Sequence, residues 1–534
     1  MASRDRRRVR WAVPGRCNQH QPGNTPEEFR PVTAHAQIAR NQASVKAHIM
    51  AVVEERVDVL LVDVENASGR SLELAVWDLL CAVGRELLSV LLAMACWSAT
   101  ASEGVQRRGV RLRLDRDYWL TQMTTLGAVH VPLFAYRDEG GKVRCPAREQ
   151  VFPLHPACRS SELCLEWETR LGSQLPFRQA QEGLTYFTHG ATKLEDSTIA
   201  RHCGLIGAVI DRSWTYRSAK DIAEILATRA TRDVETGKPL LYLSTDAHAL
   251  RRYVDDSFSA PWKMVNGIRM WCVDRKSGQV IHLGGEYTWG DCQEVAARFR
   301  SLVADYVPDG ADAPLVVLLT DGMEWIRTWV FPEMPEGTLF ILDLYHATEH
   351  IAEYARARFG VGTKAAKAWY SRVRKALYGK RGYQRATQSK RRGHRKSKRR
   401  KAPRKRTIHA SDNKHGAGEA LARELIEADV PKKHEKALFK LLHYVSQNAD
   451  RMDYPSYRAR GIQVGSGAME SFHRVASQMR LKLAGARWLP EHAIAIMNAR
   501  MMMLADRWTD FWEAGPDLTH RLQAAFSVHQ EVPS

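Results

Sequence analysis

Two aspartates follow apolar stretches of the chain, at positions where strand ends can carry chemistry. Asp321 comes directly after residues 314–320, which include six apolar or β-branched residues in a row, and Asp246 comes after residues 240–245. Such runs are typical of strands buried on both faces. In open α/β sheets, ligand sites lie beyond the carboxyl ends of strands, so these carboxylates could bind a ligand. An aspartate also caps helices and forms turns, which is the alternative role for Asp321.

A third carboxylate, Glu470, follows the flexible segment Gly465-Ser466-Gly467 at the start of a predicted helix over residues 468–482. Two carboxylates on neighbouring strands and one on a helix could hold two Mg²⁺ ions, since Mg²⁺ prefers oxygen ligands. Two such ions about 4 Å apart can promote an in-line phosphoryl displacement. We expect Mn²⁺ to substitute. A glutamate in the first helical turn also favours the helix dipole, so position alone does not assign it a catalytic role.

The elements that must position these residues alternate between strands and helices. Predicted strands cover residues 240–245, 262–273, 279–287, 314–320 and 338–342, and a predicted helix covers residues 292–306. Three consecutive strands followed by helix, strand, helix and strand is the order of the ribonuclease H-like (RNase H-like) fold. Its first and fourth strands are neighbours, so Asp246 and Asp321 should project side by side. We therefore predict an α/β RNase H-like catalytic domain with a mixed five-stranded sheet.

Several motifs resemble those of bacterial DDE insertion-sequence transposases of the ISKra type and, more distantly, Mutator-like elements. The resemblance covers roughly residues 236–515, and Ala247 stands where a glycine often follows the first aspartate. The matching segments are the 461–471 stretch around Glu470, Met479-Arg480-Leu481-Lys482, Gly485, Arg487, Trp488, Thr320-Asp321-Gly322 with Trp325-Ile326, Asp343-Leu344-Tyr345-His346 and Ser244-Thr245-Asp246.

This resemblance implies a DNA transposase that cuts its element's ends and joins them to target DNA. A DNA 3′-hydroxyl would be the nucleophile, and Asp246, Asp321 and Glu470 would bind two Mg²⁺ ions. Asp343 and His346 could bind a metal directly. We instead expect a supporting role, in which they hydrogen-bond to each other and fix the backbone. The family also implies a helical insertion, which residues 347–455 fit, and we expect a homo-oligomer on DNA. The alternatives are a DNA-binding protein without catalysis, and a nuclease of this fold that cleaves without joining.

The chain's positive charge is concentrated in one tract. Between Arg372 and Arg406 there are 18 Lys or Arg and no Asp or Glu, and subtracting these 18 from the net charge of +19 leaves +1. Such a tract is typical of a segment that is disordered when free and binds polyanions. A solvated linker or localisation signal is the alternative. The predicted DNA-binding residues of the tract are Arg391, Arg392, Arg395, Lys396, Arg399, Arg400, Lys401, Arg404, Lys405 and Arg406.

A helix-turn-helix is predicted before the sheet, with helices over residues 177–187 and 197–206. Arg201 and His202 on the second helix could reach base edges, and Arg178 and Gln179 on the first could contact phosphates. A helical hairpin used for packing or dimerisation is the alternative.

The remaining sequence sets the domain boundaries and the expected compartment. No run reaches the roughly 18 uncharged apolar residues of a membrane span, with residues 87–97 the closest, and nine cysteines without a CxxC motif fit a reducing compartment. Cys145, His155, Cys158 and Cys164 could bind zinc, but unpaired thiols fit their spacing better. We expect a cytoplasmic, nucleoid-associated protein. The predicted regions are 1–40 (disordered, basic), 41–170 (α+β), 171–235 (helix-turn-helix and connecting helix), 236–346 (first catalytic part), 347–455 (helical insertion with the disordered tract 380–415), 456–515 (second catalytic part) and 516–534 (tail).

Overall fold

The structure is a computed structural model that describes residues 42–524, apart from gaps at 63–66, 107–112, 138–142, 146–147, 149, 153–157, 255–260, 311–312, 380–415 and 516–517. The chain divides into two compact units, one formed by Met1–Val209 with Asp510–Ser534 and the other by Ile210–Thr509. The basic residues 391–406, the N-terminal residues 1–40, the predicted turn 138–141 and His155 lie outside the described residues.

The first unit contains two long helices and a small antiparallel sheet. The helices are α2 (Gln42–Val62) and α3 (Gly69–Gln106), and the sheet has the order β1-β2-β3, with β1 over Arg113–Thr124, β2 over Gly127–Arg137 and β3 over Val143–Arg144. The β1–β2 turn needs a glycine, because Gly127 has φ +108° and Thr124 Oγ1 donates to its carbonyl at 2.7 Å. Pairing with β2 extends β1 to Thr124.

Within α3, residues Gly69–Cys96 form the one helix among the described residues that is long and apolar enough to cross a membrane. The uncharged stretch at residues 87–97 lies almost wholly within this helix, whose earlier part includes the charged residues Asp78, Arg85 and Glu86. Length and composition alone identify this helix, and a buried core helix meets the same criteria.

Three further helices complete the described first unit before residue 209: α5 (Glu162–Gln174), α6 (Phe177–Phe187) and α7 (Asp196–Val209). The α6 and α7 helices fall where the predicted pair was placed. His189 and Gly190 between them adopt positive φ angles of 51° and 79°, which a regular helix cannot contain. The two predicted helices are therefore present as separate elements.

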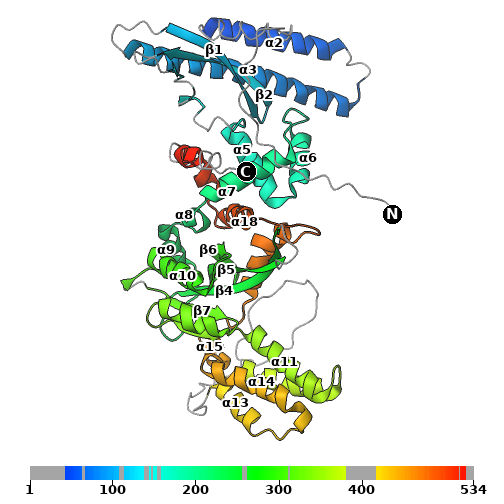
Figure 1. Ribbon diagram of the computed structural model, residues 1–534, viewed down its shortest axis with the longest axis vertical. Coiled ribbons are helices and arrows are strands. Elements are labelled where there is room, and N and C mark those ends of the chain that lie inside the picture. The colour runs from blue at the N-terminus through cyan, green and yellow to red at the C-terminus, as the bar shows by residue number, and fades with distance from the viewer. Residues whose placement is uncertain are drawn as a thin grey trace, which may run out of the picture. The chain divides into compact units, whose positions relative to one another are not determined.

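The second unit is built on a mixed five-stranded sheet with the order β6-β5-β4-β7-β8 (Figure 1). The strands are β4 (Leu240–Arg251), β5 (Trp262–Val273), β6 (Val280–Thr288), β7 (Leu315–Thr320) and β8 (Leu339–Leu342). β4, β5 and β6 pair antiparallel, whereas β4, β7 and β8 pair parallel. The first and fourth strands of this unit are therefore neighbours, as the order of elements predicted.

Both faces of the sheet are covered, which explains the continuous apolar character of β4 and β7. Leu240 and Tyr242 belong to one buried cluster, and Leu241 and Leu243 belong to another. This alternation follows from the two-residue period of a strand. The second cluster includes residues of α9 (Ala219–Thr228) and α10 (Cys292–Tyr306), and α9 and the short α8 (Arg212–Thr215) belong to this unit.

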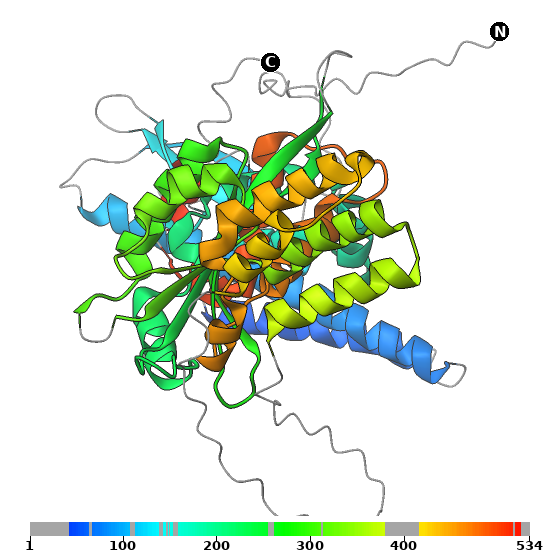
Figure 2. The same cartoon turned by 90° about the horizontal axis from the view of Figure 1, so that it is seen from below.

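The first cluster continues into a helical group made of α11 (Leu344–Phe359), α12 (Lys364–Tyr378), α13 (Ala417–Ile426) and α14 (Lys432–Asn448), which pack side by side (Figures 1 and 2). Gly360 with φ +90° ends α11, and Thr363 caps α12. The short helix α15 (Tyr454–Ala459) lies further along the chain.

Candidate active site

Asp246 and Asp321 lie at the point where two parallel strands stop pairing. The last paired residues of β4 and β7 are Ser244 and Leu319, and continuing this register by two residues places Asp246 opposite Asp321. The sequence predicted that the strand ends just before Asp246. This prediction is wrong, because β4 runs on to Arg251 against β5. The end of β7 therefore opens one side of β4 at Asp246.

The two carboxylates influence each other electrostatically. Burial raises the pKa of Asp321, and the Asp246 charge raises it further. Burial also acts to raise the pKa of Asp246, but the neighbouring His473, the backbone N–H of Ala247 and the charge of His346 together outweigh burial and lower it. Two acidic groups that are close and partly desolvated disfavour their joint ionisation, which a cation between them would relieve.

Glu470 lies in the first turn of α16 (Gly467–Phe472), and its side chain is exposed. This helix passes directly into a π-helical segment, η7 (His473–Gln478), and then into α17 (Met479–Leu481). The helix predicted over residues 468–482 is thus present with a widened middle turn, a feature frequent at functional sites. Within the described ranges, no three His, Cys, Asp or Glu side chains are grouped closely enough to hold a metal ion.

His473 connects the helix of Glu470 to Asp246. Its Nε2 lies 3.5 Å from Asp246 Oδ2, and its Nδ1 lies 3.0 Å from the Tyr287 hydroxyl and 3.1 Å from His248 Nδ1. At 3.5 Å the contact with Asp246 is long, and His473 Nε2 has no hydrogen-bond partner among the described residues. Burial and the neighbouring His473 lower the pKa of His248 to about 3, which leaves His248 neutral. The buried cluster of His248, Tyr287 and His473 therefore packs next to one oxygen of Asp246.

Asp343 connects the end of β8 to the segment before Glu470. Its Oδ1 accepts from the backbone N–H groups of Tyr345 and Ser466 at 3.0 Å each. Its Oδ2 accepts from Ser466 Oγ at 2.6 Å and from His346 Nδ1 at 2.8 Å. All four bonds are made by a side chain with no solvent exposure, so Asp343 holds the Gly465–Gly467 segment in place rather than facing a ligand.

His346 is the cationic group of this site. The hydrogen bond to Asp343 raises the pKa of His346 to about 9 despite partial burial, and the charges of Asp321 and Asp246 act in the same direction. Its side chain is 34% exposed. At neutral pH the site therefore carries an imidazolium beside two carboxylates.

Glycines on the antiparallel strands let the helix of Glu470 approach the sheet. A Cβ at Gly285 would lie 2.4 Å from Phe472, and one at Gly267 would lie 2.7 Å from the His473 ring. Arg269 on β5 donates to the Ala468 carbonyl, with its guanidinium over the rings of Trp271 and Phe472. The start of α16 therefore packs against β5 and β6 and is held there by Arg269.

The turn after Asp321 is held by the helical group. Gly322 has φ +87°, and a Cβ there would lie 2.6 Å from Leu342, so the position requires glycine. The Tyr444 hydroxyl on α14 donates to the Asp321 carbonyl oxygen at 3.1 Å. The Tyr444 ring centroid lies 3.9 Å from that of His350, so His350 packs against an aromatic ring.

The predicted DNA-reading side chains of the first unit have different environments. Arg178, Gln179 and Arg201 are exposed, and Arg178 forms a surface ion pair with Glu182. His202 is buried and its Nδ1 lies 2.6 Å from Glu168 Oε2. The prediction that His202 could reach a base edge is therefore wrong in this conformation, because the buried Glu168 carboxylate holds it in the core.

Cys158 and Cys164 of this unit are protonated thiols. Burial raises the pKa of Cys158 to about 12 and raises that of Cys164 further. Cys164 Sγ donates to the Glu168 carboxylate at 3.5 Å, and Cys145, Cys158 and Cys164 are all free cysteines. Among the described residues this favours structural thiols over zinc ligands.

Sequence reasoning missed the buried histidine cluster and the role of Ser466. The positions of the two histidines could have indicated the cluster. His248 lies two residues after Asp246 on the same strand face, and His473 lies three residues after Glu470 on the same helix. Tyr287 and Tyr444 carry no such local signal, since each reaches the site only through the tertiary fold.

No protein-family model matches this sequence, and a search of curated proteins finds no match.

Proposed function

We propose that the chain is a metal-dependent DNA transposase that cleaves the ends of a mobile element and joins them to target DNA. The observation that carries this proposal is the alignment of Asp246 with Asp321 where β4 and β7 separate, together with the ion-pair contact from Asp246 to the helix that bears Glu470. The mixed strand order and the parallel pairing of β4 with β7 support an RNase H-like fold. The α6 and α7 helices support a helix-turn-helix role in reading DNA.

The chemistry of the three carboxylates suits Mg²⁺ or Mn²⁺, although Asp246, Asp321 and Glu470 are not grouped closely enough in the described structure to hold one ion together. Asp246 and Asp321 offer carboxylate oxygens next to each other, and the Glu470 side chain makes no hydrogen bond or ion pair with another described residue. Hard divalent cations prefer such oxygen ligands. When bound, two such ions would activate the attacking oxygen and stabilise the leaving one.

The chain's own residues would bind and orient the substrate around these carboxylates. His473 lies 3.5 Å from Oδ2 of Asp246, and Asp343 fixes the segment from which Glu470 projects. The imidazolium of His346, raised in pKa to about 9, provides a positive charge that attracts a DNA phosphate. The residues 391–406 would supply general affinity for phosphates. A homo-oligomer on DNA in the cytoplasm is part of this proposal.

A strand-transfer assay tests the proposal against its two alternatives. Oligonucleotides taken from inverted repeats that flank the coding region are incubated with the chain, Mg²⁺ and a supercoiled plasmid. Joined products support a transposase, whereas nicking without joining supports a nuclease of the same fold. Retention of DNA without either product supports a DNA-binding protein, and no retention refutes all three.

A further inference from the structure

An exposed stripe on α14 combines lysines with an aromatic ring and lies beside the candidate active site. Lys432, Lys436, Phe439 and His443 recur at spacings of three or four residues, which places them along one side of the helix. All four side chains are exposed, and Phe439 is 70% exposed. An exposed aromatic ring flanked by lysines suits a partner that is both anionic and flat, although the exposed Glu435 also lies on this side of the helix.

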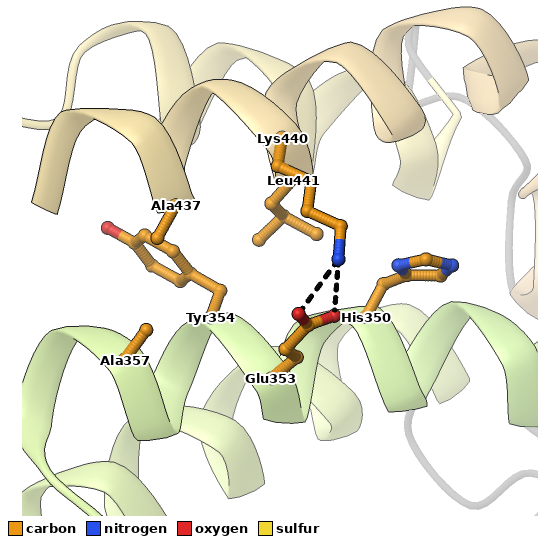
Figure 3. A pocket seen from close by; sticks show the side chains of 7 residues that line it. All are labelled: His350, Glu353, Tyr354, Ala357, Ala437, Lys440 and Leu441. Atoms are coloured by element: carbon orange, nitrogen blue, oxygen red, sulfur yellow. Dashed lines mark hydrogen bonds and ion pairs between the residues drawn. The ribbon is translucent and has the colours of Figure 1, made fainter.

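The side of α14 that faces α11 and the core makes contacts within the protein, so the stripe lies on the opposite, exposed side. Figure 3 shows Lys440 reaching from α14 to Glu353 on α11, with nitrogen–oxygen distances of 2.8 and 3.0 Å. Leu441 and Val445 are buried in the cluster beneath. Lys440 is therefore neutralised, while Lys432, Lys433 and Lys436 have no ion-pair partner among the described residues.

Phe439 and His443 form a flat surface at the middle of the stripe. Their rings are nearly parallel, with an interplanar angle of 14° and centroids 6.1 Å apart. An open hollow of ≈ 580 Å³ lies against these two rings and the side chains of Lys433 and Lys436. Nucleic-acid bases stack on such exposed rings irrespective of sequence, while lysines contact the backbone.

The C-terminal end of α14, beyond the stripe, contacts the backbone of Asp321 and the side chain of Arg327. At the C-terminal end of α14, Tyr444 donates to the Asp321 carbonyl, and the Arg327 guanidinium donates to the Gln447 carbonyl at 2.9 Å. Arg327 lies in η4 (Ile326–Val330), the π-helical segment shortly after Asp321. From Lys432 to Gln447 the helix rises about 22 Å, which matches about six base steps of DNA. DNA bound along α14 would therefore reach the carboxylates.

We propose that this α14 stripe, defined as Lys432, Lys436, Phe439 and His443, binds the DNA next to the reacting phosphate. Phe439 stacks on an unpaired base, and the lysines hold the adjoining phosphates. This inference rests on the proposed function, because it assigns a substrate-binding surface to the same site.

Fluorescence anisotropy in EDTA tests the stripe without requiring catalysis. The full chain is titrated with two labelled DNAs, one fully paired and one with an unpaired end that contains 2-aminopurine. We expect Phe439→Ala to weaken binding of the unpaired end about 5- to 100-fold and to abolish the quenching of 2-aminopurine. Phe439→Trp should restore both, and binding of the paired DNA should change little. Ile426→Ala, an exposed apolar change on α13, is the matched control and should have no effect.

The lysines are tested by Lys432→Glu with Lys436→Glu, compared with Lys364→Glu on the exposed start of α12. The double variant should weaken binding of both DNAs and flatten the salt dependence, while Lys364→Glu should change neither. If the Phe439→Ala protein quenches 2-aminopurine as strongly as the wild type does, the inference is overturned. A different oligomeric state of the Phe439→Ala protein, measured by light scattering, would also overturn it, because the stripe would then be a protein interface. If the wild-type chain binds neither DNA, the proposed function fails as well; if it binds both and the stripe variants are unaffected, only this inference fails.

Discussion

Replacing Asp343 by Asn should destabilise the second unit by about 2–4 kcal/mol. Asp343 accepts four hydrogen bonds in a fully buried position, from two backbone N–H groups, Ser466 Oγ and His346 Nδ1. Bonds to a charged acceptor contribute about 1.5–3 kcal/mol and neutral ones about 0.5–1.5 kcal/mol, so losing the charge weakens each by about 1 kcal/mol. The NH₂ group of the introduced asparagine must also face two of the groups that donate to Asp343, which costs further free energy. The Ser466 hydroxyl can rotate to accept instead of donate, and this lowers the cost.

The same substitution should lower the pKa of His346 from about 9 toward its ordinary value near 6.5. Because the folded pKa is raised, His346 contributes stability that is fully present below pH 6.5 and is lost as the pH rises through about 9. The Asn variant should therefore lose more stability at pH 6 than at pH 9.5. This pH dependence distinguishes the loss of the carboxylate from a general packing defect.

The assay is urea unfolding followed by tryptophan fluorescence at both pH values, with histidine NMR for the His346 pKa. Asp450→Asn is the matched control, since Asp450 is exposed and lies 3.9 Å from Arg327, and it should change the free energy of unfolding by less than about 1 kcal/mol. An Asp343→Asn protein with wild-type stability and a His346 pKa still near 9 would refute the assignment of Asp343 as the residue that fixes this segment.

Three further predictions concern different parts of the chain. Deleting residues 380–406 should weaken binding to all DNA and reduce the slope of log affinity against log salt by about 0.9 for each lost phosphate contact, and an unchanged slope would show that the tract does not touch DNA. Gly285→Ala should destabilise the chain by about 1–3 kcal/mol in urea, because its Cβ would lie 2.4 Å from Phe472, whereas the exposed Gly237→Asn should be nearly neutral. A chain limited to residues 210–509, which form one compact unit, should keep salt-sensitive DNA binding but lose discrimination of the element's terminal repeats; retained discrimination would place sequence recognition in the second unit.

The sheet could be predicted from the sequence because its strands are apolar on both faces. The limits of β5 and α10 agree with those predicted, since turns and polar residues bound both elements clearly. The continuation of β4 beyond Asp246 could not be predicted, because it depends on pairing with β5 rather than on local composition. The break between α11 and α12 falls at Gly360 and Gly362, both with positive φ, so this pair of glycines is a signal for it in the sequence.

The candidate site was predictable in its carboxylates but not in the groups that position them. Asp246 and Asp321 could be placed together once the first and fourth strands were taken as neighbours. The environment of His202 could not, because its burial depends on Glu168 in a different helix. Tyr287 and Tyr444 reach the site from β6 and α14, so their contacts with His473 and Asp321 arise only when the chain is folded.

Strand transfer by carboxylate variants tests the central claim most directly. A DNA oligonucleotide with a pre-cleaved element end and a free 3′-hydroxyl is joined to a plasmid by wild type, Asp246→Asn, Asp321→Asn and Glu470→Gln in Mg²⁺, Mn²⁺ or Ca²⁺, with DNA binding measured in parallel. We predict joining by wild type in Mg²⁺ and Mn²⁺ but not in Ca²⁺, and no joining by any of the three variants, all of which should bind DNA as wild type does. Full joining by the Glu470→Gln protein would contradict the assignment of Glu470, and full joining by either aspartate variant would contradict the site itself.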